Sequence, residues 1–156
     1  MSMTRSFDDG DWLSKLVQNP LWNIWHMPEA ELTPPQRTFV RVWAVICEVN
    51  NGGFNQYFFN SYSAHAGQAA NSFREIGADV AAGIVERACN AFGPTGPSAD
   101  HKIRQTRLDE IDPNRGTFLR REDDEFIAQS DDIDRKLFEY VTANVAHFAG
   151  AAELLA

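Results

Sequence analysis

The densest set of side chains that could do chemistry lies in residues 122–134. Seven of these thirteen residues are acids: Glu122, Asp123, Asp124, Glu125, Asp131, Asp132 and Asp134. Paired carboxylates can perform acid–base catalysis, but nothing in the sequence indicates the low-dielectric cleft that would shift their pKa values. Acids one helical turn apart lie roughly 6 Å from each other, so they could instead form rows of negative charge on one surface. The plainer alternative is a solvated face with helix-start charges, and the flanking arginines favour it because they neutralise part of any field.

Signals for metal binding and nucleophilic catalysis are weak. The four histidines, at 26, 65, 101 and 147, lack metal-ligand spacing, and Cys47 and Cys89 are far apart in the chain. Residues 112–123 approach the frame of a calcium loop, but Thr117 stands where glycine is needed. There is no phosphate loop and no nucleophile-elbow motif. We therefore expect no catalytic residues, no metal and no cofactor, and two buried free thiols.

The most distinctive stretch is an Asn-Gly-Gly-Phe segment within residues 48–60. Gly52 and Gly53 are suited to reversing the chain between two helices, because glycine tolerates backbone conformations that other residues avoid. The polar side chains around them could hydrogen-bond the exposed helix ends across this turn; they are Glu48, Asn51, Gln56 and Asn60. Amides beside aromatic rings also describe small-molecule sites, so a polar ligand pocket stays open as the alternative.

The elements that must position these groups all have helical periodicity. A strongly apolar helix is predicted from Pro34 and Pro35 to Val49, and its apolar rows on two sides place it at the centre of the fold. Further apolar stripes cover residues 66–76, 80–92, 103–111 and 133–148. The last of these helices is expected to take N-cap oxygens and favourable charge from Ser130, Asp131 and Asp132. No strand-like alternation of useful length occurs. The sequence thus predicts an all-α, single-domain, compact helical bundle of about six to eight helices over residues 1–156, with the aromatic-rich segment 1–28 packed on it.

The formal net charge is −8, from 22 acidic and 14 basic residues. This balance argues against direct nucleic-acid binding, because a phosphate backbone would repel the protein, and it permits attraction to basic partners. Solubility alone is the simpler explanation of the charge. The N-terminus has no apolar signal region and no run of 18 apolar residues exists, so we expect a cytoplasmic protein with no membrane span. The aromatic-rich N-terminus leaves room for a homodimer.

The Asn-Gly-Gly-Phe segment resembles the signature of a family of DNA-mimic proteins. The stretch from Ala69 to Ala78 and the last helix, around Tyr140, are also similar to that family, and the resemblance covers roughly residues 35–150. It implies an all-α fold and, for the best-known member, a dimer whose carboxylates imitate the phosphates of duplex DNA. The mimicking carboxylates are not part of the signature, so the resemblance assigns none of them in this chain.

These observations favour a non-enzymatic, acidic protein-binding module, with a basic, DNA-binding protein such as a helix-turn-helix regulator as its partner. The seven acids of residues 122–134 are the candidate contacts. Two alternatives stay open. One is an immunity-type inhibitor of a toxin or enzyme. The other is a small-molecule-binding protein or enzyme that uses the polar cluster around Asn51.

Overall fold

The longest helix, α3 (Pro34–Phe59), begins where the sequence predicts. Two prolines occupy its first positions, and the Thr33 N–H donates to Gln36 Oε1 at 2.9 Å. Such interactions satisfy donors that a helix start leaves free. The Gln36 amide also donates to the carbonyl of His147 at 2.8 Å, so the start of α3 is joined to the far end of the chain. The computed structural model describes residues 22–148.

Six further α-helices surround α3 in the described residues. In chain order they are α2 (Trp22–His26), α4 (Ala66–Glu75), α5 (Asp79–Asn90), α6 (His101–Ile111), α7 (Arg120–Ala128) and α8 (Ser130–Ala143). Short 3-10 turns, η2 (Glu29–Glu31), η3 (Ser61–His65) and η4 (Val145–His147), join or extend them. With seven α-helices and no strand between residues 22 and 148, the predicted all-α bundle is confirmed.

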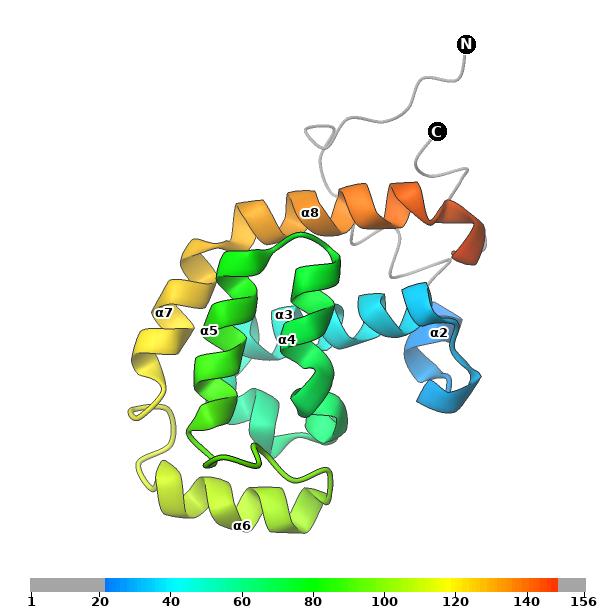
Figure 1. Cartoon of the computed structure of the whole chain (residues 1–156). Coiled ribbons are helices and arrows are strands. Elements are labelled where there is room, and N and C mark those ends of the chain that lie inside the picture. The colour runs from blue at the N-terminus through cyan, green and yellow to red at the C-terminus, as the bar shows by residue number, and fades with distance from the viewer. Residues whose placement is uncertain (1–21, 149–156) are drawn as a thin grey trace.

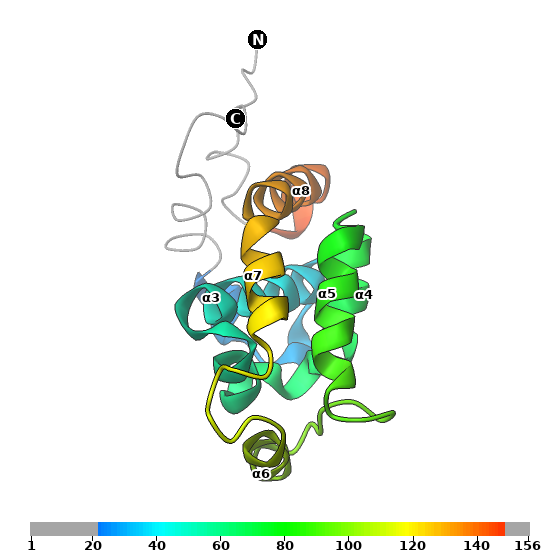
Figure 2. The same cartoon turned by 90° about the vertical axis from the view of Figure 1, so that its left-hand side faces the viewer.

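The helices are arranged in layers around α3. The antiparallel pair α4 and α5 covers one side of α3, and α7 stands beside α5 (Figure 1). Viewed from α7, α8 crosses one end of the molecule and α6 crosses the other (Figure 2). Helix α3 contacts α2, α4, α6, α7 and α8, so its predicted central position is confirmed.

Aromatic rings fill the centre of the fold. Phe54, on α3, packs edge-on against Phe126 of α7 with ring centroids 5.6 Å apart. Phe126 also meets Phe73 of α4 edge-on at 5.7 Å. All three side chains are fully buried, and edge-to-face pairs of this kind add to the stability from apolar burial. These contacts fix α7 between α3 and α4.

The start of α8 differs from the sequence prediction. Gln129, not Ser130, is the N-cap residue of α8, and the Ser130 hydroxyl donates to the carbonyl of Ile127 at 2.6 Å. The predicted N-cap by Ser130, Asp131 or Asp132 is therefore wrong, because α7 and α8 almost abut and leave these residues inside the first turn. The predicted acidic charge at the start of the helix is confirmed, since Asp131 and Asp132 lie in that turn. Residues 1–21 of the predicted N-terminal segment lie outside the described residues. In the described part of that segment, the ring of Trp25 packs against the ring of Tyr62, with centroids 4.8 Å apart. No helix in the described part of the chain is long and apolar enough to cross a bilayer.

Candidate functional site

The Asn-Gly-Gly-Phe segment forms a sharp break within α3. Gly52 and Gly53 leave helical geometry, and Gly53 has φ of +76°, which L side chains rarely adopt. A Cβ atom on Gly53 would also lie 2.5 Å from Asp123 Oδ2, closer than real Cβ atoms come. The predicted reversal at these glycines is thus a kink, after which the helix resumes at Phe54. Glycine is required at position 53 by backbone conformation and by close approach.

Asp123 fills the space that Gly53 leaves open. The Phe54 N–H, one of the donors exposed by the break, donates to Asp123 Oδ1 at 2.7 Å. Burial raises the pKa of Asp123 above its ordinary value, and the hydrogen bond from Phe54 opposes that rise only in part. Asp123, which the sequence suggested as a partner contact, therefore has an internal role: it caps the second part of α3 from α7.

The side-chain amides of Gln56 and Asn60 bond to a carboxylate and not to helix ends. Gln56 Nε2 donates to Glu48 Oε2 at 3.0 Å, and Asn60 Nδ2 donates to the same oxygen at 2.6 Å. Glu48 is buried, so these bonds compensate for the loss of water around its charge. The three side chains bridge the kink along one face of α3. Asn51, the remaining residue of the predicted cluster, is exposed.

The carbonyl groups at the end of α3 are bonded by Arg104, whose role the sequence analysis missed. The Arg104 guanidinium is 0% exposed, and it donates to the carbonyls of Phe58 at 2.8 Å and Asn60 at 3.0 Å. It also donates to the carbonyls of Ser98 at 2.8 Å and Ala99 at 3.2 Å. Burial lowers the pKa of this guanidinium. Arg104 thus holds α6 and the preceding loop against α3; its position in a polar helix carried no signal of this role.

Asp112 is the centre of the loop after α6, where the sequence approaches the frame of a calcium loop. It is 1% exposed. Its carboxylate accepts hydrogen bonds from Gly116 N at 2.6 Å, Phe118 N at 3.1 Å and Asn55 Nδ2 at 2.9 Å. Burial alone would raise the pKa of Asp112, but the hydrogen bonds outweigh it and leave the pKa below its ordinary value. The loop is therefore folded around a carboxylate, not around a cation.

Two of the candidate acids are paired with arginines. Glu125 forms ion pairs with Arg87 of α5 and, at 2.9 Å, with Arg121 one turn before it. Glu122 lies 4.0 Å from Arg87. The hydrogen bond from Arg121 and the charge of Arg87 hold the pKa of Glu125 below its ordinary value. The outward field of these two acids is accordingly reduced.

The other candidate acids lack such partners. Asp124, Asp131 and Asp132 are exposed, and within residues 22–148 they make no ion pair. Asp134 is partly buried. Asp124 lies on α7 and the other three on α8, so the structure divides the acidic stretch between two helices. Of the seven candidate acids, Asp124, Asp131 and Asp132 are thus the ones that are both exposed and without an ion pair in the described residues.

An open depression of about 440 Å³ lies between the kink and the loop after α6. Its lining includes Asn51, Gly52, Arg115, Arg120 and Asp124. Gln56 and Asn60 do not line it, because they are bonded to Glu48. Of the three amides that the sequence suggested for a ligand pocket, only that of Asn51 lines the depression. Among the described residues, no histidine, serine or cysteine lines this depression.

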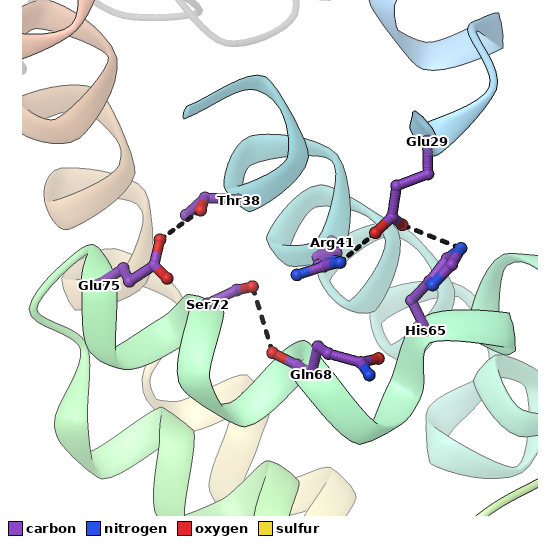
Figure 3. A network of polar contacts seen from close by, with 7 residues as sticks. All are labelled: Glu29, Thr38, Arg41, His65, Gln68, Ser72 and Glu75. Atoms are coloured by element: carbon purple, nitrogen blue, oxygen red, sulfur yellow. Dashed lines mark hydrogen bonds and ion pairs between the residues drawn. The ribbon is translucent and has the colours of Figure 1, made fainter. Parts of the chain in front are cut away.

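A separate polar network joins α3 to η2, η3 and α4 (Figure 3). Glu29 pairs with Arg41 of α3, and its other oxygen lies 3.0 Å from His65 Nε2. Thr38 donates to Glu75 of α4. Each carboxylate in this network is bonded to a residue of another element, so the network holds η2, α3 and α4 together.

Neither thiol is arranged for chemistry. Cys47 and Cys89 are free and partly buried, and burial raises the pKa of each to about 12. At neutral pH both are therefore protonated and weakly nucleophilic. Among the described residues, no group of three or more His, Cys, Asp or Glu side chains could hold a metal ion.

Comparison with known proteins rests on one match. The family model described as DMP19-like protein matches residues 30–144, from η2 through the end of α8. No curated protein and no solved structure matches the chain. The family match spans the kink of α3, the Glu48 bridge, Arg104, Asp112 and the whole acidic stretch of residues 122–134. The chain therefore belongs to the DMP19-like protein family, the DNA-mimic family that its Asn-Gly-Gly-Phe segment resembles.

Proposed function

We propose that this protein is a non-enzymatic binding module that acts as a DNA mimic, occupying the DNA-binding surface of a basic protein partner. The observation that carries the proposal is membership of the DMP19-like family over residues 30–144. The net charge of −8 supports it, because it attracts a basic surface at long range.

The geometry narrows the set of acids that would imitate phosphates. Asp124, Asp131 and Asp132 are exposed and free of ion pairs in the described part of the chain, whereas Glu122 and Glu125 face arginines. A partner would have to displace Arg87 or Arg121 to use the latter two. We therefore assign the contact to the three exposed aspartates, Asp124 on α7 and Asp131 and Asp132 on α8, together with Asp134 on α8.

The proposal is tested by competition between a partner and duplex DNA. The immobilised protein is incubated with lysate of its source cell at low salt, and bound proteins are eluted with duplex DNA. A mimic and the duplex compete for one surface, so a basic DNA-binding protein should leave the resin with the duplex and also with added salt. Partners that stay bound at saturating duplex would contradict mimicry and favour an immunity-type inhibitor.

Two matched variants locate the contact surface. Asp131→Asn with Asp132→Asn removes two negative charges from α8, and Asp109→Asn with Glu110→Gln removes two from exposed positions on α6, at the other end of the molecule (Figure 2). The α8 variant should lose about tenfold or more in partner affinity and show a weaker salt dependence, while the α6 variant binds as wild type. Equal losses in both would refute the assignment to α8.

A further inference from the structure

A small cleft lies between α3, α7 and α8, three helices whose arrangement is seen in Figure 2. Its volume is about 210 Å³, and it is more enclosed than the depression at the kink. The lining residues are Trp43, Ile46, Asn50, Phe126, Ser130, Ile133 and Asp134. Pockets for cofactors and metabolites usually measure about 300–1,000 Å³, so this cleft suits a single side chain better than a whole small molecule.

A carboxylate without a partner stands in the wall of this cleft. Asp134 is partly buried, and no hydrogen bond or ion pair reaches it within residues 22–148. Burial raises the pKa of Asp134, and the negative charge of Asp131, three residues earlier on α8, raises it further. A partly desolvated carboxylate in this position is stabilised by a cation that can hydrogen-bond to it. An anionic ligand is disfavoured by the same two charges.

The remaining walls are suited to a flat cation. Trp43 stacks on Phe39 with ring centroids 6.3 Å apart and also lines the cleft. Indole is the aromatic ring that attracts cations most strongly. The apolar side chains of Ile46, Phe126 and Ile133 offer contacts to an aliphatic stem.

We propose that this cleft receives an arginine side chain of the basic partner, with the guanidinium hydrogen-bonded to Asp134 and packed against Trp43. The inference rests on the proposed function and deepens it by naming the group that is recognised. A guanidinium is planar, can bond a carboxylate through two N–H groups and stacks on indole, whereas a lysine ammonium is a strongly hydrated point charge. The cleft then acts as the anchor of the interface, and the neighbouring exposed Asp131 and Asp132 draw the basic partner toward it.

The test uses the isolated full-length protein and a small probe. Nα-acetyl-arginine methylamide is titrated into the ¹⁵N-labelled protein, and the indole N–H signals of the four tryptophans are followed by NMR, with Trp43 identified from the variant Trp43→Phe. We expect the Trp43 signal to shift saturably, with half-saturation on the order of 1 mM, as befits a single side chain without its partner protein. The citrulline analogue, which has the same shape but no charge, should leave the signal in place.

Two further variants make the outcome decisive. Asp134→Asn keeps the shape of the side chain and should weaken the arginine probe at least tenfold, whereas Asp109→Asn, at an exposed position of α6 far from the cleft, should leave it unchanged. A Trp43 shift that is absent, that citrulline reproduces or that survives Asp134→Asn would overturn the proposal. A lysine analogue that binds as well as the arginine probe would overturn the selectivity for guanidinium.

Failure of the anchor and failure of the proposed function are distinguishable. The probe titration contains no partner and no DNA, so it reports on the cleft alone. If the probe fails while duplex DNA still releases a captured partner, the anchor is wrong and mimicry stands. If the probe binds at Asp134 while no partner is released by duplex DNA, the cleft is right and mimicry is wrong.

Discussion

Replacing Asp112 by asparagine should destabilise the protein by about 2–4 kcal/mol. The Asp112 carboxylate accepts from Asn55 and Gly116 through one oxygen and from Phe118 through the other. Asparagine keeps one acceptor oxygen and turns the other into an NH₂ group. If the amide oxygen faces Asn55 and Gly116, the partly buried hydrogen bond from the Phe118 N–H loses its acceptor, which costs about 1–3 kcal/mol. The retained bonds also lose their charge assistance, which adds about 1 kcal/mol.

Urea unfolding at neutral pH measures this loss as a lower midpoint at unchanged slope. Asp109→Asn is the matched control, because Asp109 is exposed on α6 and its replacement makes the same change in charge. We expect the control to stay within about 0.5 kcal/mol of wild type. Equal stability of the two variants would refute the idea that Asp112 is the centre of the loop.

The ionisation of Asp112 also makes the stability of the protein depend on pH. The hydrogen bonds lower the pKa of Asp112 in the folded protein, so folding favours its ionised form. The stabilisation is fully present above the ordinary aspartate pKa of about 3.9 and is lost as pH falls through the lowered folded value. The gap between wild type and Asp112→Asn should therefore narrow below about pH 4. A gap that widens on acidification would contradict the direction of the shift.

The glycine at the kink, the buried arginine and the two thiols should each respond measurably to substitution or chemical modification. Gly53→Ala should destabilise the protein by about 1–3 kcal/mol in thermal unfolding, because φ is +76° and the added methyl would meet Asp123. Gly67→Ala is the control: nothing lies within 4 Å of its added methyl, so it should be neutral or stabilising by up to about 1 kcal/mol. Arg104→Met should lower the free energy of unfolding by about 3–5 kcal/mol, since four carbonyl groups lose their donor; a loss under 1 kcal/mol would show that water replaces it. Cys47 and Cys89, with pKa values raised to about 12, should react with a thiol reagent at pH 8 many times more slowly in the native protein than in urea, and equal rates would contradict their burial.

Local pattern was sufficient where a short run of sequence contains the whole physical cause. The start of α3 follows from two prolines, and the break follows from Gly52 and Gly53, because the backbone preferences of these residues act without tertiary contacts. The apolar rows of α3 predicted its burial on several sides, since a helix that is apolar around most of its circumference needs several neighbours.

Partners far apart in the chain were beyond such reasoning. Asp123 caps Phe54 across 69 positions, and Arg104 bonds the Phe58 carbonyl across 46. Nothing in the sequence distinguishes Asp123 from Asp124, yet one points into the kink of α3 and the other into solvent. Hence the acidic stretch could be identified, but its division into capping, ion-paired and exposed acids could not.

The sequence by itself determined the helical class, the central helix, the glycine break and the family to which the chain belongs, because periodicity, turn chemistry and a short signature are local properties. Only the tertiary structure decided which acids remain unpaired and that Trp43 and Asp134 share a cleft. These properties depend on how α3, α7 and α8 cross, and the crossing is set by the packing of aromatic side chains such as Phe54 and Phe126, which come from distant parts of the chain.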